Sequence, residues 1–140
     1  MLRAIRLSAE TSVSVFNDGD VDVVVVEAQG RPELLRNEGI AGASWCSIHL
    51  QGLGENRDAM GARVTLQAGG HRQIRERRSS GSYLSANDPR LHFGLGEAEM
   101  IDSIDVRWPG GETSHYTQLP VRQFLKLVCG KKEFEILPRK

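Results

Sequence analysis

Three aspartates around a glycine are the residues of this sequence whose types and spacing come nearest to a metal site. Asp18, Asp20 and Asp22 stand at alternate positions on either side of Gly19. Calcium takes about six to eight oxygen ligands, and a tight loop with carboxylates at alternate positions supplies them. With Gly19 as the sixth loop position, however, the first two ligand positions hold a serine and Phe16. The loop therefore predicts either a weak, degenerate calcium site or a plain Asx/Gly turn that leads into a strand.

The other residues that could do chemistry lack the spacing of known sites. The four histidines show no HxH or HxxxH pattern, so we do not predict a zinc site. The serine-rich segment at 79–82 lacks the strand–GxSxG–helix context of an activated nucleophile. We therefore predict that the protein is not an enzyme. The alternative is a hydrolase acting on glycans through Asp88, Asp102 or Asp105, which requires a deep cleft with two carboxylates about 5–10 Å apart.

Two long polar loops are the candidates for ligand binding. They span residues 52–60 and 79–89 and are rich in glycine, serine and asparagine. Binding residues concentrate on loops that a rigid scaffold positions. We expect the contacts with a protein or glycan ligand to come from Asn56, Arg57, Asp58, Tyr83 and Asn87.

The segment from residue 71 to residue 78 concentrates positive charge. As a strand it places Arg75 and Arg77 on one side and Ile74, Glu76 and Arg78 on the other. We expect a solvated strand whose arginines deter edge-to-edge pairing, and a contact with an anion or an acidic glycan is the alternative. No aromatic residues interleave, and 18 basic residues balance 18 acidic ones. Nucleic-acid binding is therefore not expected.

The elements that position these residues read as β-strands. Hydrophobicity alternates with period two along most of the chain, and Gly69-Gly70 and Pro109-Gly110-Gly111 mark turns. We predict an all-β fold, an antiparallel β-sandwich of eight or nine short strands. Val23–Val26 is expected to be a strand buried on both faces, and residues 32–36 a single helical turn. Phe93 and Leu95 are expected to point into the core.

The tryptophans and cysteines give further expectations. Trp108 lies in phase with apolar neighbours, which predicts core, whereas Trp45 is expected to be partly exposed or to lie at a junction. Cys46 and Cys129 are expected to be buried free thiols. A disulfide between them is left open in case the protein is exported.

The length of 140 residues and the 39% apolar content fit one folded domain. Residues 1–40 are interpreted as an appended segment and 41–140 as the compact domain, because small residues gather near residue 42. There is no run of about 18 apolar residues, so no membrane span is predicted. The first residues lack the apolar stretch of a signal peptide.

Four motifs in order carry a family resemblance. They begin at Asn56-Arg57-Asp58-Ala59-Met60-Gly61, Gly81-Ser82-Tyr83-Leu84-Ser85, His92-Phe93-Gly94-Leu95-Gly96 and Val106-Arg107-Trp108-Pro109-Gly110-Gly111. The sequence resembles the ASPIC/UnbV domain, the C-terminal module of cartilage acidic protein-like FG-GAP proteins, over about residues 44–130. Residues 17–37 are similar to a degenerate final FG-GAP repeat. One repeat cannot close a propeller, because a propeller needs several blades.

The resemblance implies a non-catalytic binding module of an extracellular or envelope-associated adhesion-type protein, with a ligand that is not specified. Calcium is the one cofactor that the resemblance and the acidic loop suggest. A structural cap or a self-association domain is the alternative. In that interpretation, an unpaired Val23–Val26 strand would form a homodimer.

Overall fold

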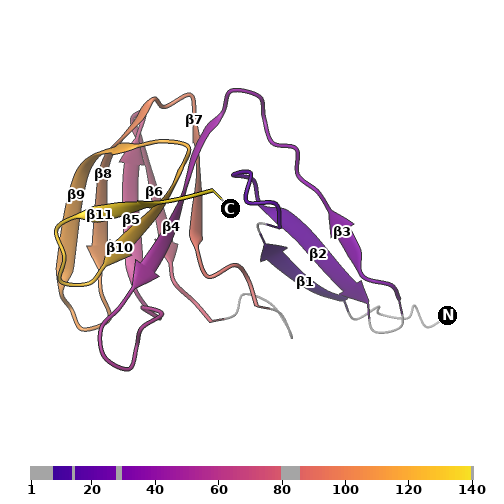
Figure 1. Ribbon diagram of the computed structural model, residues 1–140, viewed down its shortest axis with the longest axis horizontal. Helices are drawn as coiled ribbons and strands as arrows, with labels where there is room; N and C mark the ends of the chain where they lie inside the picture. The colour runs from indigo at the N-terminus through magenta and orange to yellow at the C-terminus, as the bar shows by residue number, and fades with distance from the viewer. Residues whose placement is uncertain (1–7, 14, 28–29, 80–85, 140) are drawn as a thin grey trace.

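The computed structural model describes residues 8–13, 15–27, 30–79 and 86–139. The regular secondary structure in these ranges consists of β-strands alone. The prediction of an all-β fold is confirmed. The eleven strands form three sheets (Figure 1). They are β1 (Ser8–Val13), β2 (Asp22–Glu27), β3 (Glu33–Leu35), β4 (Ser44–Gln51), β5 (Arg63–Ala68), β6 (His71–Glu76), β7 (Leu91–Gly96), β8 (Met100–Arg107), β9 (Thr113–Pro120), β10 (Gln123–Val128) and β11 (Phe134–Leu137).

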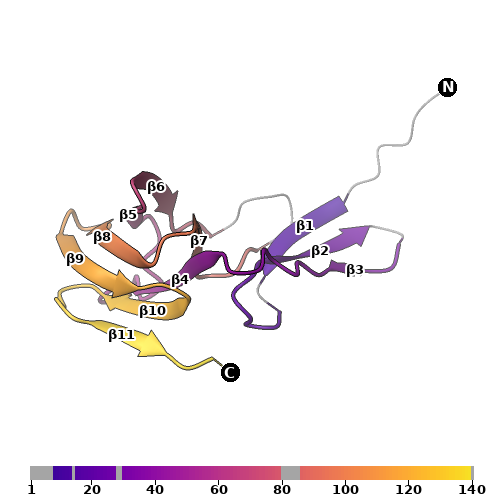
Figure 2. The ribbon, with the colours of Figure 1, turned by 90° about the horizontal axis from the view of Figure 1, so that it is seen from above.

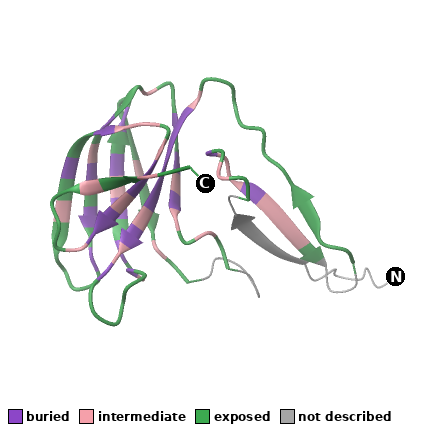
Figure 3. Ribbon diagram, in the orientation of Figure 1, coloured by how far each residue is buried: buried purple, intermediate pink, exposed green. Residues whose placement is uncertain are grey.

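Eight of these strands make a sandwich of two four-stranded sheets. One, here the β7 sheet, has the order β11-β10-β4-β7, and the other, the β6 sheet, has the order β6-β5-β8-β9. Side chains from both sheets, among them Ile48, Leu66, Phe93 and Leu125, are fully buried in one core. Buried and more exposed positions alternate along β5, β7 and β8 (Figure 3). Both the sandwich and the inward direction of Phe93 are confirmed.

One pairing departs from the wholly antiparallel prediction. β4 and β10 are parallel, with Ser47 opposite Phe124. The chain leaves β9 in one sheet and enters β10 in the other through two residues, and the N–H of Arg122 in this turn donates to the carbonyl of Trp45 (2.6 Å). β10 therefore starts beside the start of β4, and the two strands run in the same direction.

Two turns of the sandwich contain glycines with positive φ angles. Gly69 and Gly70 have φ of 55° and 76°, so the β5–β6 connection is the two-residue turn predicted from its sequence. The turn at Pro109-Gly110-Gly111 is also confirmed, because the N–H of Trp108 donates to the carbonyl of Glu112 (2.8 Å). Trp108 itself is buried, as its phase predicts.

β1, β2 and β3 form a separate N-terminal sheet beside the sandwich (Figure 2). The helical turn expected at residues 32–36 is wrong, because Glu33–Leu35 is extended and pairs with Val23–Val25 of β2. Pairing with a β-branched strand outweighs the weak local preference of a short helical turn. All three strands lie within the segment 1–40. The division into 1–40 and 41–140 stays a prediction.

The Val23–Val26 strand is confirmed as a strand, but two expectations about it are wrong. Val23, Val24 and Val25 are half-buried rather than buried on both faces, and Val26 is 46% exposed. β2 is also not unpaired, because it lies between β1 and β3 and bonds to both. Among the described residues there is no helix long and apolar enough to cross a membrane.

Candidate ligand-binding cleft

The outer face of the β7 sheet carries a row of three side chains from neighbouring strands. The register places Phe124 of β10 beside Ser47 of β4 and Ser47 beside His92 of β7. Trp45 lies on the same face. Its ring stacks on His92 at 6.2 Å between centroids and packs at a tilt against Phe124 at 5.0 Å. The face away from the core is therefore partly aromatic.

Two arginines cover these rings. The guanidinium of Arg90 lies 5.0 Å from the centroid of Phe124, and that of Arg139 lies 5.4 Å from the ring of Trp45. Cations are attracted to the faces of aromatic rings, more so where water is excluded. As a result, Phe124 is only 4% exposed although it lies outside the main core.

The loop of residues 15–21, here the N-terminal loop, packs onto this face. Gly19 has φ of +111°, and a Cβ there would meet the indole of Trp45 at 2.1 Å, so only glycine allows this contact. The guanidinium of Arg90 donates to Oδ1 of Asn17 (2.8 Å). Trp45 thus lies at the junction of the N-terminal segment with the sandwich, which is one of the two places expected for it.

A cleft of about 620 Å³ opens beside the junction. The cleft is lined by the row Phe124, Ser47 and His92 and by Gly19 and Val21 of the N-terminal loop. The rest of its lining comes from residues 74–78 of β6 and its continuation, and from Asn87, Asp88, Arg90 and Leu91. β6 and β7 are the edge strands of their sheets on this side of the sandwich. The cleft therefore lies where both sheets end and where the N-terminal loop meets them.

The charged groups of the cleft do not balance. Its lining has four arginines, Arg75, Arg77, Arg78 and Arg90, and two carboxylates, Glu76 and Asp88. Four positive charges less two negative charges leave two positive charges.

Both carboxylates already have an arginine partner. Asp88 takes two hydrogen bonds from the Arg90 guanidinium, at 2.6 and 2.9 Å, and Glu76 lies 3.1 Å from Arg78. Within the described part of the chain neither Arg75 nor Arg77 forms an ion pair. Arg77 donates to the carbonyl of Arg78, and Arg75 lies over the ring of Phe93 at 5.5 Å. The uncompensated charge therefore belongs to Arg75 and Arg77.

His92 is a neutral part of this surface. Burial lowers the pKa of its imidazole below the ordinary value of 6.5, and the nearby Arg75 lowers it further. At neutral pH the ring therefore adds no charge to the cleft. A neutral imidazole offers one donor and one acceptor nitrogen.

Two carboxylates of the acidic loop accept hydrogen bonds from the backbone. Asp22 is fully buried, and its two oxygens accept hydrogen bonds from the backbone N–H groups of Val15 (3.1 Å) and Asn37 (3.0 Å). Asp18 accepts from the N–H of Asp20 (3.3 Å), which is the hydrogen bond of an Asx turn. Among the described residues no group of three or more His, Cys, Asp or Glu is placed to share a metal ion. Calcium binding at this loop stays a prediction.

The predicted contact residues are not brought together. The side chain of Asn56 bonds both the N–H and the carbonyl of Met60 (2.9 and 3.0 Å) and so closes its own loop, which also holds Arg57 and Asp58. Asn87 lines the cleft, whereas Tyr83 lies outside the described residues. The binding role of these five residues stays a prediction. Three of the four arginines of the cleft were visible in the sequence as part of the basic segment at 71–78, but nothing local indicated Arg90 or the surface opposite them.

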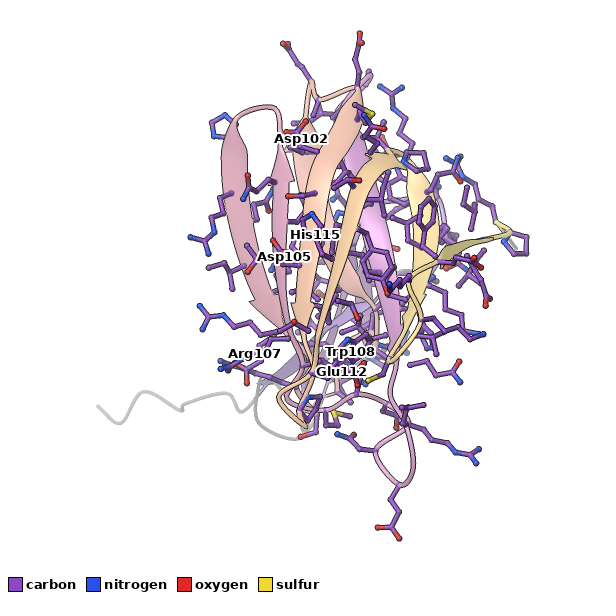
Figure 4. The ribbon with its side chains drawn as sticks, turned by 90° about the vertical axis from the view of Figure 1, so that its left-hand side faces the viewer. Asp102, Asp105, Arg107, Trp108, Glu112 and His115 are labelled. Atoms are coloured by element: carbon purple, nitrogen blue, oxygen red, sulfur yellow. The ribbon has the colours of Figure 1, made fainter. Side chains whose placement is uncertain are left out.

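The carboxylates of the hydrolase alternative lie elsewhere. Asp102 and Asp105 are exposed on β8, and Asp105 pairs with His115 across β8 and β9 at 2.6 Å (Figure 4). The lining of the cleft includes neither of them. Asp88 does line it, but it is held by Arg90.

The two cysteines are free, as predicted. Cys46 is buried in β4, and burial raises the pKa of its thiol to about 12. Cys129 is only half-buried, with its Sγ 3.5 Å from a carboxylate oxygen of Glu112.

Comparison with known families agrees with this architecture. The model of the family described as ASPIC and UnbV matches residues 52–134. The chain belongs to the ASPIC and UnbV family. The matched part of this ASPIC and UnbV domain contains β5 to β10 and begins after β4, so the N-terminal sheet and the N-terminal loop lie outside it. No curated protein matches the chain.

Proposed function

We propose that this ASPIC and UnbV domain is a non-catalytic binding module whose cleft takes a negatively charged group of a ligand. The observation that carries the proposal is the pair Arg75 and Arg77, which lines the cleft without an ion-pair partner in the described chain. A guanidinium presents a planar fork of donors that matches carboxylate, sulfate or phosphate groups. The two other arginines are paired with carboxylates, Arg90 with Asp88 and Arg78 with Glu76.

The surroundings of the two arginines favour a ligand over mere solvation. An exposed ion pair contributes little, because water screens it. Here one side of the cleft is the packed outer face of the β7 sheet and another is the N-terminal loop, so part of the solvent is displaced. An anion bound there interacts more strongly with Arg75 and Arg77 than it would on a flat surface.

The cellular context of the proposal comes from the family resemblance. An adhesion-type protein outside the cell or in its envelope meets acidic proteins and acidic glycans, and both present the charge that the cleft would recognise. Extracellular location is part of the proposal.

A second candidate function is self-association, which exposed apolar side chains of the N-terminal sheet favour. Val26, Leu34 and Leu35 are 46%, 46% and 56% exposed. Since β2 is already paired on both sides, a homodimer would use the face or the outer edges of this sheet. Sedimentation at several concentrations measures it, and a monomer at every concentration would exclude it.

The proposed function is tested with two polyanions, poly-glutamate and heparin, and with paired arginine variants. Arg75→Gln with Arg77→Gln removes the two uncompensated charges. The matched control, Lys131→Gln with Lys132→Gln, makes the same change in net charge in the exposed turn between β10 and β11, outside the lining of the cleft. We expect the cleft variant to bind at least about tenfold more weakly and the control to change less than about threefold. Equal losses would mean that only net charge matters and would refute the cleft.

A further inference from the structure

β6 has a free edge along the cleft. It is the last strand of the β6 sheet, and within the described chain it pairs with β5 alone. A strand at the edge of a sheet presents unpaired N–H and C=O groups and can therefore accept another strand. The edge is six residues long, about 20 Å.

The register shows which backbone groups are available. In an antiparallel pair, successive residues direct their N–H and C=O groups alternately toward the partner strand and away from it. The N–H of Arg77 donates to the carbonyl of Ala62, and the carbonyl of Arg77 accepts from the N–H of Gly61 (both 2.8 Å), so the backbone groups of Arg77 point toward the β5 side. Because the direction alternates, the backbone groups of Arg75 and Gln73, two and four residues earlier, also point toward β5. The backbone groups of Arg72, Ile74 and Glu76 therefore point out of the sheet.

The side chains of β6 divide into two sets with different surroundings. Gln73 and Arg75 turn toward the β7 sheet, since Gln73 donates to the carbonyl of Gly94 (2.6 Å) and Arg75 covers Phe93. Ile74 lies on the opposite side, in register with Thr65, and is 44% exposed. A strand added at this edge would thus have arginines beside one of its faces and an apolar side chain beside the other.

We propose that the ligand of the cleft is an extended acidic peptide segment that pairs with β6 as an additional strand. The inference rests on the proposed function and specifies its ligand. Main-chain hydrogen bonds to Arg72, Ile74 and Glu76 supply affinity, and carboxylates at alternate positions meet Arg75 and Arg77. The preferred sequence alternates acidic residues with residues of high β-propensity.

A peptide fits this surface better than a glycan does. Sugar rings bind by stacking on exposed aromatic side chains, but Trp45 and Phe124 are 9% and 4% exposed and carry arginines on their faces. The edge of β6 offers backbone donors and acceptors in the repeat that a strand requires. Arginines along an edge also repel a second copy of the same edge, so the charge that prevents self-pairing selects an acidic partner.

The test uses the full chain and three probes followed by two-dimensional NMR. The probes are a blocked hexapeptide of alternating Glu and Thr, the same peptide with Gln for Glu, and a heparin hexasaccharide. Bound Glu-Thr peptide is expected to slow hydrogen exchange at the amides of Arg72, Ile74 and Glu76. The amides of Gln73 and Arg75 are protected by β5 already and should change little. The Gln peptide is expected to bind at least about tenfold more weakly.

Ile74→Pro provides a matched pair with Ile74→Ala. Proline removes the outward N–H of residue 74 without touching the ladder to β5, and edge positions of this kind tolerate proline. We expect the Glu-Thr peptide to bind about two- to tenfold more weakly to Ile74→Pro and to bind Ile74→Ala within about twofold of the original. If Ile74→Pro does not fold, the hydrogen-exchange experiment on the unaltered chain still shows whether the peptide pairs with β6.

The outcomes separate this inference from the proposed function. Peptide binding without protection of the three amides would overturn strand addition. Binding of the hexasaccharide but not of the peptide would also overturn it, while the anion-binding cleft would stand. If none of the probes binds, both the cleft and the added strand are refuted.

Discussion

Replacing Asp22 with alanine should loosen the N-terminal sheet whether or not calcium is present. The buried carboxylate accepts one hydrogen bond from the backbone N–H of Val15 and one from that of Asn37, at 3.1 and 3.0 Å. These two residues lie before β2 and after β3, so the carboxylate ties both flanks of the sheet to the start of its central strand. Alanine leaves both N–H groups without this acceptor.

The expected loss follows from these two bonds. A hydrogen bond to a charged group contributes about 1.5–3 kcal/mol, and Asp22→Ala removes the acceptor of both bonds. We therefore expect the free energy of opening the N-terminal sheet to fall by about 3–5 kcal/mol, which speeds exchange of its amides by about 10² to 10⁴-fold. Asp22→Asn keeps one acceptor oxygen and should lose about half as much free energy.

Hydrogen exchange of the β2 and β3 amides measures the effect, with each variant in millimolar calcium and in chelator. The backbone role of Asp22 predicts the same loss in both buffers. A calcium site predicts that the original protein gains protection from calcium and that Asp22→Ala abolishes this gain, because an ion that binds only the folded form stabilises it by mass action. A loss confined to the calcium sample would refute the hydrogen-bond argument and support the metal site.

Two further predictions concern the junction at Trp45 and two half-buried histidines. Gly19→Ala should displace the N-terminal loop from Trp45 and raise the exposure of the indole to a fluorescence quencher. Gly42→Ala, also at a positive φ (+81°) but with open space around it, should not. Equal quenching in the two variants would show that the loop does not depend on this contact. Burial lowers the pKa values of His49 and His92, so below the ordinary value of 6.5 the unfolded chain takes up protons before the folded one does. The thermal unfolding midpoint should therefore fall as the pH drops from 7 toward 5, and more gently in His92→Asn, and an unchanged slope in that variant would contradict the pKa argument.

The sequence predicted the features that depend on neighbouring residues. The β5–β6 turn follows from two glycines that can take positive φ, and the burial of Phe93 and Trp108 follows from alternation along one strand. Three expectations in the N-terminal segment are wrong. The helical turn at 32–36 and the unpaired Val23–Val26 strand were inferred without knowing that these segments pair with each other. The expected burial of this strand on both faces came from its run of valines alone, which does not show whether other residues cover the sheet.

The cleft was beyond sequence reasoning for a similar reason. Arg75 and Arg77 were recognised as one side of a basic strand, but an arginine pair in a sequence is equally consistent with a solvated edge. The difference lies in what faces them, and the row Phe124, Ser47 and His92 comes from three strands up to 77 residues apart. Only the parallel pairing of β4 with β10 and the packing of the N-terminal loop bring that surface to β6.

The two sides of the cleft come from different parts of the chain, and this bears on what the domain recognises. β6, β7 and Phe124 lie inside the residues that match the ASPIC and UnbV family, whereas Gly19, Val21 and Ser47 lie outside them. The positive charge and the open strand edge therefore belong to the family part, and the N-terminal loop limits the space next to them. The positive charge and the strand edge would attract an acidic strand, and the N-terminal loop would limit the size of the strand that fits. Gly19 can approach Trp45 only without a side chain, so the position of the N-terminal wall of the cleft depends on this glycine contact together with the hydrogen bond from Arg90 to Asn17.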